Sequence, residues 1–276
     1  MFKRSAMFYG LLAATASAAI VTTNVGGDAT TASIQPAVDN FRTLLGTNNG
    51  VGGSFGSGRR EINWDGVAAG FSDPSFLPAN FFNANSPRGL VMSSNAGNLL
   101  VTTNGLSDFA AFSAAKFLAL TGAGNQLDVT FFIPGTATAA TVSGFGAVFL
   151  DADFNIANIE AFYANGTSAG VFDVADTSVS TLGFSFLGIS GNAGERFSRF
   201  RLTLGDGGTL LSGTCLIDCV MVDDFIYGEP QAAIPEPAPL VIVSAGLIIL
   251  ALLRRQRRAS YFPAQKSHFR LGNTPL

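Results

Sequence analysis

The chain has 276 residues, of which 47% are hydrophobic and only 13% are charged. Soluble domains usually carry about 25% charged residues, so the surface must obtain its polarity from Ser, Thr, Asn and Gly. This composition argues against intrinsic disorder, which needs low hydrophobicity and high charge, and against nucleic-acid binding, which needs clustered Lys and Arg.

The N-terminus has the organisation of a secretory signal peptide over residues 1–19. Lys3 and Arg4 supply positive charge, residues 7–14 form a short apolar core, and residues 16–18 supply the small-residue pattern at which signal peptidase cleaves. The apolar core is too short to remain as a membrane-spanning helix. A buried helix at the start of the domain is the alternative. We expect export through the Sec translocon.

Trp64 and the glycine-rich segment before it are the first candidates for a site. Trp64 lies between two polar residues and can stack on a sugar ring; the alternative is a residue at the edge of the core. Residues 52–56 match the G-x-S-x-G nucleophile pattern, but no strand is expected before them and no helix after them. The only histidine, His268, lies beyond the apolar C-terminal segment. We therefore interpret residues 52–56 as a flexible glycine loop and expect no enzyme.

Residues 20–230 show the period-two alternation of β-strands, with one face toward a core and one toward water. The turn Asn165-Gly166 favours a hairpin of type I′ geometry. One short stretch, residues 109–120, is helix-like. The strand candidates are 89–93, 99–103, 127–133, 145–150, 158–163, 169–174, 184–189, 199–204 and 220–227. Many short strands with turn signals predict an all-β ectodomain, an antiparallel β-sandwich or jelly roll.

Two pairs of carboxylates are the best candidates for a binding site. Asp151 and Asp153 are two residues apart, so on a strand they point to the same face. Asp223 and Asp224 precede the aromatic residues of the last strand. Oxygen ligands of this kind suit calcium, and strands distant in sequence often become neighbours in a sandwich. We expect a structural Ca²⁺ site; a solvated acidic rim and a glycosidase pair of carboxylates are the alternatives.

Cys215 and Cys219 are the only cysteines. An oxidising compartment favours a disulfide between them. On one straight strand their Cα atoms would lie about 13 Å apart, compared with about 4.4–6.8 Å in a disulfide. A bridge therefore needs a bend between them, and two reduced thiols are the alternative.

The C-terminus has three consecutive parts. Pro235, Glu236 and Pro237 lie in a rigid extended segment, because each proline fixes φ and removes a backbone donor. Residues 240–253 form an apolar run without a charge, which we expect to be a single transmembrane helix. Four arginines follow it and should stay in the cytoplasm by the positive-inside rule: Arg254, Arg255, Arg257 and Arg258.

This order of Pro-Glu-Pro, short apolar helix and arginine cluster resembles the PEP-CTERM sorting signal of Gram-negative bacteria, here within residues 231–258. The resemblance implies that exosortase, a membrane protease-transpeptidase, processes the signal. It also implies a transient membrane anchor, a final place at the cell surface or in the extracellular matrix, and an association with exopolysaccharide and biofilm. The chain departs from the family in continuing after the arginines, where residues 259–276 are expected to be a cytoplasmic tail.

Three segments of the body, residues 59–66, 144–153 and 222–228, resemble secreted bacterial β-domains that are often attached to such signals. Jelly-roll carbohydrate-binding modules have a similar broad plan. The leading hypothesis is therefore a non-enzymatic exported surface or matrix protein. The second is a carbohydrate-binding module that grips exopolysaccharide, and the third is a polysaccharide-active hydrolase.

Overall fold

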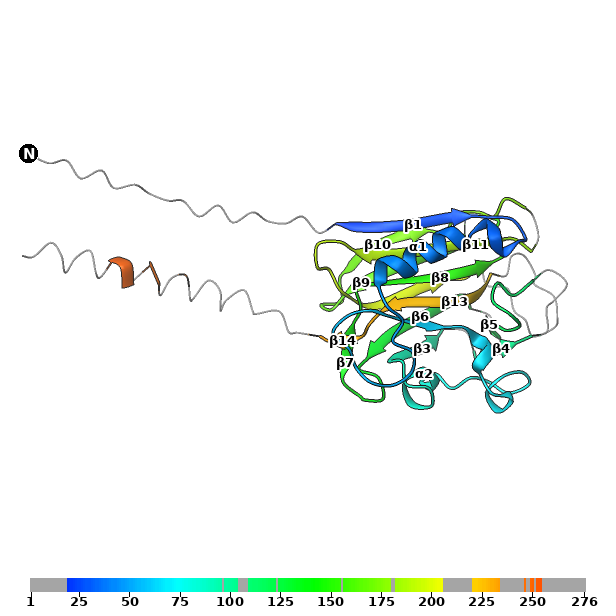
Figure 1. Ribbon diagram of the computed structural model, residues 1–276, viewed down its shortest axis with the longest axis horizontal. Coiled ribbons are helices and arrows are strands. Elements are labelled where there is room, and N and C mark those ends of the chain that lie inside the picture. The colour runs from blue at the N-terminus through cyan, green and yellow to red at the C-terminus, as the bar shows by residue number, and fades with distance from the viewer. Residues whose placement is uncertain are drawn as a thin grey trace, which may run out of the picture. The chain divides into compact units, whose positions relative to one another are not determined.

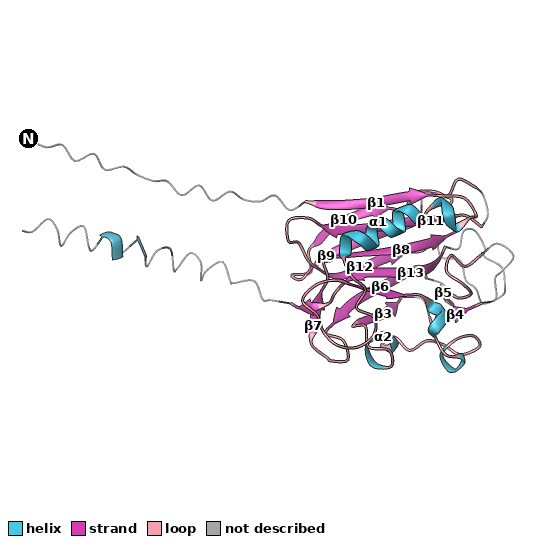
Figure 2. Cartoon of the chain, viewed as in Figure 1, coloured by secondary structure: helices cyan, strands magenta, loops and turns pink. Residues whose placement is uncertain are grey.

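Two antiparallel sheets of seven strands each make up the body of the protein in this computed structural model (Figures 1 and 2). The strands run from Ile20 to Ala232. The structure describes residues 19–95, 97–103, 109–122, 124–154, 156–179, 182–205, 220–233, 246, 249–250 and 252–254.

The first sheet has the strand order β1-β11-β8-β13-β5-β4, and β2 pairs with β13. Its strands are β1 (Ile20–Gly26), β2 (Arg59–Ile62), β4 (Leu99–Thr102), β5 (Phe117–Leu120), β8 (Gly144–Leu150), β11 (Phe184–Gly191) and β13 (Met221–Gly228). Every residue of β8 and β13 is buried, because both faces of this sheet are covered.

The second sheet has the strand order β10-β9-β12-β6-β7-β14, and β3 pairs with β6. Its strands are β3 (Leu90–Ser94), β6 (Gln126–Phe132), β7 (Ala139–Thr141), β9 (Asn158–Tyr163), β10 (Ser168–Asp173), β12 (Phe197–Thr203) and β14 (Gln231–Ala232). In β6 buried and half-buried residues alternate strictly, so this strand has one face in the core and one toward solvent.

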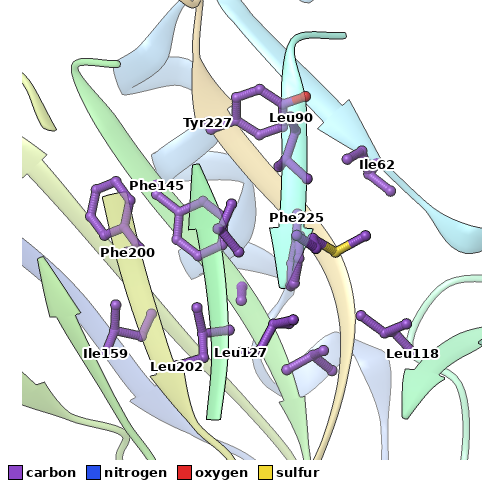
Figure 3. Packing of buried hydrophobic residues seen from close by; sticks show 14 of the residues in the cluster. Ile62, Leu90, Leu118, Leu127, Phe145, Ile159, Phe200, Leu202, Phe225 and Tyr227 are labelled. Carbon is purple, nitrogen blue, oxygen red and sulfur yellow. The ribbon is translucent and has the colours of Figure 1, made fainter. Parts of the chain in front are cut away.

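The faces of the two sheets that meet enclose the main core. Phe145 of β8 stacks on Phe200 of β12 with ring centroids 5.0 Å apart, and Phe131 of β6 lies 5.4 Å from Tyr227 of β13. Figure 3 shows the rings of Phe145, Phe200 and Tyr227 among the aliphatic side chains that fill the same space. Contacts between rings of opposite sheets identify the fold as a β-sandwich.

A helix covers the outer face of the first sheet. α1 (Gln35–Leu45) lies across that face in Figure 1 and buries Phe41 against Phe186 of β11, with ring centroids 5.5 Å apart. Gly146 and Gly188 are paired across β8 and β11 directly beneath the Phe41 ring. A Cβ atom would come within 2.9 Å of the ring at Gly146 and within 2.6 Å at Gly188, so both positions need glycine.

The remaining helical elements are short and lie between strands. They are α2 (Phe81–Ala84) and three 3₁₀ turns, Thr31–Ser33, Trp64–Gly66 and Ala69–Phe71.

The nine predicted strands are confirmed, with ends that differ by one or two residues. The helix predicted over 109–120 is wrong, because Phe117–Leu120 is strand β5 and the described residues before it are not helical. α1 was not predicted, nor were the five strands β1, β2, β5, β7 and β14.

The predicted hairpin at Asn165-Gly166 joins β9 to β10, but its turn is not of type I′. Gly166 has a φ of 82°, whereas Asn165 does not take a positive φ. Instead the Asn165 Oδ1 atom accepts a hydrogen bond from the Thr167 amide at 3.0 Å. A side chain that bonds the backbone two residues on stabilises this turn.

The chain divides into two units, Met1–Ala233 and Ile234–Leu276. In the second unit the described residues 246, 249–250 and 252–254 are helical. Within the part of the chain that the structure describes, we find no helix with both the length and the hydropathy needed to cross a membrane.

Candidate functional site

A cleft of about 360 Å³ opens between two loop segments that follow β2 and precede β3. The first segment runs from Asn63 to Phe71 and the second from Phe81 to Arg88. Its lining residues are Asn63, Gly66, Val67, Ala68, Phe71, Phe81, Phe82, Asn85, Ser86 and Arg88.

Phenylalanine rings form the apolar part of the cleft. Phe71 is half-buried, and its ring centroid lies 5.0 Å from that of Phe81. Phe81 is in turn 5.0 Å from Phe82, edge to face. Phe82 continues into the core through Trp64, whose centroid is 5.6 Å away. These contacts fix the rings of the cleft on the packed core, so the apolar surface is rigid before any ligand arrives.

Hydrogen bonds to the neighbouring loops fix both walls of the cleft. The Asp65 Oδ1 atom accepts hydrogen bonds from the amides of Ala115 and Lys116, at 2.8 and 2.9 Å. The Asn83 side chain bonds the Gly135 amide at 3.0 Å and the Thr136 carbonyl at 2.8 Å. The first contact anchors the wall after β2 and the second anchors α2.

The polar groups of the cleft are two amides, a hydroxyl and a guanidinium. Asn63 and Asn85 are exposed, and their side-chain amides form no hydrogen bond with any described residue. Arg88 is half-buried; its Nη1 atom donates to the Ser86 hydroxyl, and its Cζ atom lies 5.8 Å from the centroid of the Phe82 ring. The cleft therefore offers donors and acceptors beside an aromatic surface.

Arg88 places a positive charge in a half-buried position where no carboxylate of the cleft neutralises it. Its Nε atom is buried without a hydrogen-bond partner among the described residues. Burial lowers the pKa of Arg88, and the nearby Arg60 guanidinium lowers it further. Of the residues that line the cleft, none is a carboxylate.

The glycine-rich loop beside the cleft is built around a buried ion pair. Arg60 is fully buried and binds Glu229 through two contacts of 2.6 and 2.7 Å. Its remaining donors bind the carbonyl oxygens of three glycines of the loop: Gly50, Gly52 and Gly53. The loop that was predicted to be flexible is thus fixed by the Arg60 guanidinium. The spacing of the glycines alone does not reveal this contact.

A second cavity of about 220 Å³ lies on another side of this loop and contains Arg196. The Arg196 guanidinium donates to the Thr141 hydroxyl at 3.0 Å and to the carbonyl oxygens of Thr141 and Glu229 at 2.5 and 3.0 Å. Burial lowers its pKa. Glu229 also lines this cavity, but its carboxylate is neutralised by Arg60.

Trp64 has no exposed surface, which excludes direct stacking of its indole on a sugar ring in this structure. It packs edge to face on Phe82 and on Phe225, as the alternative of a core residue implies. The segment that contains Trp64 is nevertheless one wall of the cleft, since Asn63 and Gly66 line the cleft.

Asp223 and Asp224 are both buried, and they lie in a β-bulge. Between Val222 and Phe225 strand β13 has one more residue than β8 opposite it, so both carboxylates face the side covered by α1. Asp223 Oδ2 accepts hydrogen bonds from the amides of Phe112 and Ser113, at 2.7 and 3.1 Å.

Burial, together with the charge of Asp224, raises the pKa of Asp223 to about 8. Burial also raises the pKa of Asp224, although its ion pair with Arg42 at 3.0 Å acts against this. Arg42 lies 3.3 Å from Glu61 as well. The pair therefore retains a proton at neutral pH and is part of the contact between α1 and the first sheet.

Asp151 and Asp153 follow the end of β8. Burial raises the pKa of Asp153, and the charge of Asp176 adds to this. Among the described residues no three His, Cys, Asp or Glu side chains come together as a metal site, so the two predicted pairs do not form one group of four. Calcium binding stays a prediction, to be tested by the melting temperature of the protein in millimolar calcium and in chelator.

The other predicted residues lie outside the described part of the chain. These are residues 1–18 of the signal peptide predicted over residues 1–19, Cys215 and Cys219, and the sorting-motif residues Pro235, Glu236, Pro237, Arg255, Arg257 and Arg258. Arg254 is described, as an exposed helical residue.

Sequence reasoning missed the cleft residues Phe71, Phe81, Phe82, Asn85 and Arg88. One signal for them was present, since residues 80–88 combine two adjacent phenylalanines with three asparagines and an arginine in a stretch without period-two alternation. Such a stretch indicates a loop, and an aromatic pair in a loop must either join the core or form a surface.

No model of a protein family matches the chain, and no curated protein matches it. Several solved structures are similar to it, among them a carbohydrate-binding module and a phage tailspike domain. A family 6 carbohydrate-binding module is 16% identical with a TM-score of 0.29, over 57% of this chain and 94% of the module. The enzymatically active domain of tailspike protein 4 from bacteriophage CBA120 is 12% identical with a TM-score of 0.27, over 62% of this chain and 22% of that chain. At these TM-scores neither likeness identifies a function, so the residues of the cleft must carry it.

Proposed function

We propose that the protein is a non-enzymatic carbohydrate-binding protein that holds sugar units of a polysaccharide in the cleft between residues 63–71 and 81–88. The observation that carries this proposal is the half-buried ring of Phe71, packed on the buried Phe81, beside two exposed amides that have no partner among the described residues. A sugar ring has an apolar face of C–H groups and an edge of hydroxyls. The rings of the cleft suit the first and the amides of Asn63 and Asn85 suit the second.

The size of the cleft supports a small part of a longer ligand. Small-molecule sites usually enclose about 300–1,000 Å³, and this cleft of about 360 Å³ lies near the lower limit. It would take one or two sugar units, with the rest of a polysaccharide chain in solvent.

The lining of the cleft favours binding over hydrolysis. A glycosidase needs two carboxyl groups on either side of the scissile bond, and the residues that line this cleft include no Asp or Glu. We therefore expect the purified protein to release no shortened product from any polysaccharide that it binds. Release of such products would support the hydrolase hypothesis instead.

Calorimetric titration of the full chain with soluble oligosaccharides tests the proposal. The substitution Phe71→Ala removes a half-buried ring of the cleft and should weaken binding about fivefold or more, as for an interface residue worth over about 1 kcal/mol. Phe76→Ala is the matched control, because Phe76 is 47% exposed and does not line the cleft. Equal affinity of both variants for the glycan, or no glycan binding by the unaltered protein, would contradict the proposal.

We further propose that the protein acts outside the cell, after export through the Sec translocon and processing by exosortase. The support is the sequence alone: the signal-peptide pattern at the N-terminus and the Pro-Glu-Pro segment, apolar run and arginine cluster at the C-terminus. Intact-mass analysis of the protein from cells would locate both ends of the mature chain.

A substitution separates sorting from export. Glu236→Ala should leave the protein unprocessed in the inner membrane, because exosortase must recognise the motif where it leaves the bilayer. Replacement of Lys266 and Arg270 by alanine, in the tail beyond the arginine cluster, is the control and should change nothing. Normal surface delivery of the Glu236 variant would contradict the role of this motif.

A further inference from the structure

The arginines of the body differ in whether a carboxylate neutralises them. Seven lie between residues 28 and 236, a segment that also carries nineteen acidic residues. Five of the seven have a carboxylate within ion-pair distance: Arg42, Arg59, Arg60, Arg199 and Arg201. The two without a carboxylate partner among the described residues are Arg88 and Arg196, and each of these lines one of the two cavities described above.

This distribution is unexpected for an acidic protein. Carboxylates outnumber cations more than two to one in this segment, and the fully buried Arg60 has a carboxylate at 2.6 Å. A half-buried guanidinium without a counter-charge costs free energy, because burial removes water and the neutral partners of Arg88 and Arg196 replace only part of that solvation. A ligand that brings an anionic group removes that cost when it binds.

Arg88 is placed to accept such a group. Its Nη1 atom donates to the Ser86 hydroxyl, and its Cζ atom lies 5.8 Å from the centroid of the Phe82 ring. Its Nη2 atom makes no hydrogen bond with a described residue and, unlike Nε, is not enclosed. A guanidinium with an open Nη2 donor suits a carboxylate, because a charge-assisted hydrogen bond is stronger than a neutral one.

We propose that the cleft selects an acidic polysaccharide, one whose sugars carry a carboxylate, and that Arg88 binds that carboxylate. This inference rests on the proposed function and names its ligand class. The half-buried Phe71 contacts the face of the sugar ring, Asn63 and Asn85 bind hydroxyls, and Arg88 binds the anionic group. Because no carboxylate lines the cleft, nothing within it repels the anionic group.

Titration with oligogalacturonate and with its methyl ester tests the inference without any mutation. The two ligands share one sugar skeleton, and esterification removes the charge while adding one methyl group to each carboxylate. We expect the ester to bind the full chain about tenfold more weakly or worse. A sulfated galactan oligosaccharide forms a third arm, since sulfate also binds guanidinium groups; tighter binding of this ligand would overturn the assignment to a carboxylate.

Variants locate the effect. Arg88→Gln should remove the preference for the acid over its ester, while Arg88→Lys, which keeps the charge but not the fork, should keep part of it. Arg199→Gln makes the same change of charge in β12, outside both cavities, and should leave the preference intact. Loss of the preference in Arg196→Gln rather than in Arg88→Gln would move the site to the second cavity and overturn the proposal.

The outcomes for the two proposals are distinct. Equal affinity for the acid and the ester, lost in Phe71→Ala, would overturn the acidic ligand and leave carbohydrate binding in place. No binding of acidic, esterified, sulfated or neutral glycans would overturn both.

Discussion

The two sheets of the sandwich have the same number of strands but opposite surroundings. In the first sheet β8 is buried along its whole length, between the second sheet on one side and α1 on the other. In the second sheet β6 alternates between the core and solvent. The sequence of each strand follows from this: Gly144–Leu150 is apolar throughout, whereas Gln126–Phe132 alternates.

The difference also decides what charged groups do in each sheet. On the outer face of the second sheet Arg201 binds Asp128 through two contacts of 2.9 Å in partial contact with solvent. Under α1 the pair Asp223 and Asp224 is removed from solvent, and its pKa values are raised. Arginine and aspartate thus form a partly solvated ion pair on the second sheet and a buried contact under α1 on the first.

Removal of a ring from the covered face should have the largest effect. Phe186→Ala leaves a cavity beneath α1 and should lower the free energy of unfolding by about 3–5 kcal/mol, as for other buried phenylalanines. Val171→Ala on β10 is the control, because Val171 is 57% exposed, and should cost less than about 0.5 kcal/mol. Denaturant unfolding measures both. Equal losses would show that α1 does not seal this face.

The buried aspartates should make stability depend on pH. The folded protein keeps a proton on Asp223 up to about pH 8, whereas an unfolded chain releases it near pH 4. Between these values the unfolded state binds fewer protons, so the free energy of unfolding falls as the pH rises. Asp224→Asn removes the like charge and should make this fall smaller.

Denaturation midpoints at pH 5 and pH 8 measure the effect. Asp39→Asn is the control, because it makes the same change of charge and removes another partner of Arg42, but Asp39 is exposed and does not contact Asp223. An unchanged slope in Asp224→Asn, or an equal change in Asp39→Asn, would show that the pair does not cause the pH dependence.

The smallest effect is expected on the open face of the second sheet. Arg201→Gln breaks the ion pair with Asp128. The Arg201 side chain is 33% exposed and the Asp128 side chain is 22% exposed. Such pairs contribute about 0.2–1 kcal/mol, and high salt should reduce the difference further. A loss above about 2 kcal/mol would mean that this face is covered in solution.

The strands were predictable where one face meets solvent or where an apolar run is long. β6 and β12 show period two, β8 is an apolar segment bounded by turns, and β13 has apolar residues on either side of its two aspartates. β5 was not predictable, because its four buried residues follow an alanine-rich stretch that favours a helix. α1 shows a signal in hindsight: Ala37, Val38, Phe41 and Leu45 lie on one face after Pro36 at its start.

The cleft could not be predicted from the sequence, because its two walls are separated in the chain and approach each other only through the fold. The turn after β2 and the α2 segment carry no common motif. The orientation of Asp223 and Asp224 was hidden for a related reason. Alternation places adjacent residues on opposite faces, and only the bulge turns both to one side.

The glycine pair beneath Phe41 has a consequence for how the strands align. Gly146 and Gly188 lie opposite each other only in the native register of β8 and β11. A slip of one residue would invert the faces and bring a side chain into the space of the ring. The packing of Phe41 from α1 on this glycine pair therefore favours the native register of β8 and β11. Arg42 follows Phe41 in α1 and binds Asp224. Because the two glycines have no Cβ atoms, Phe41 can pack on the sheet, and this packing also positions the Arg42 guanidinium beside Asp224.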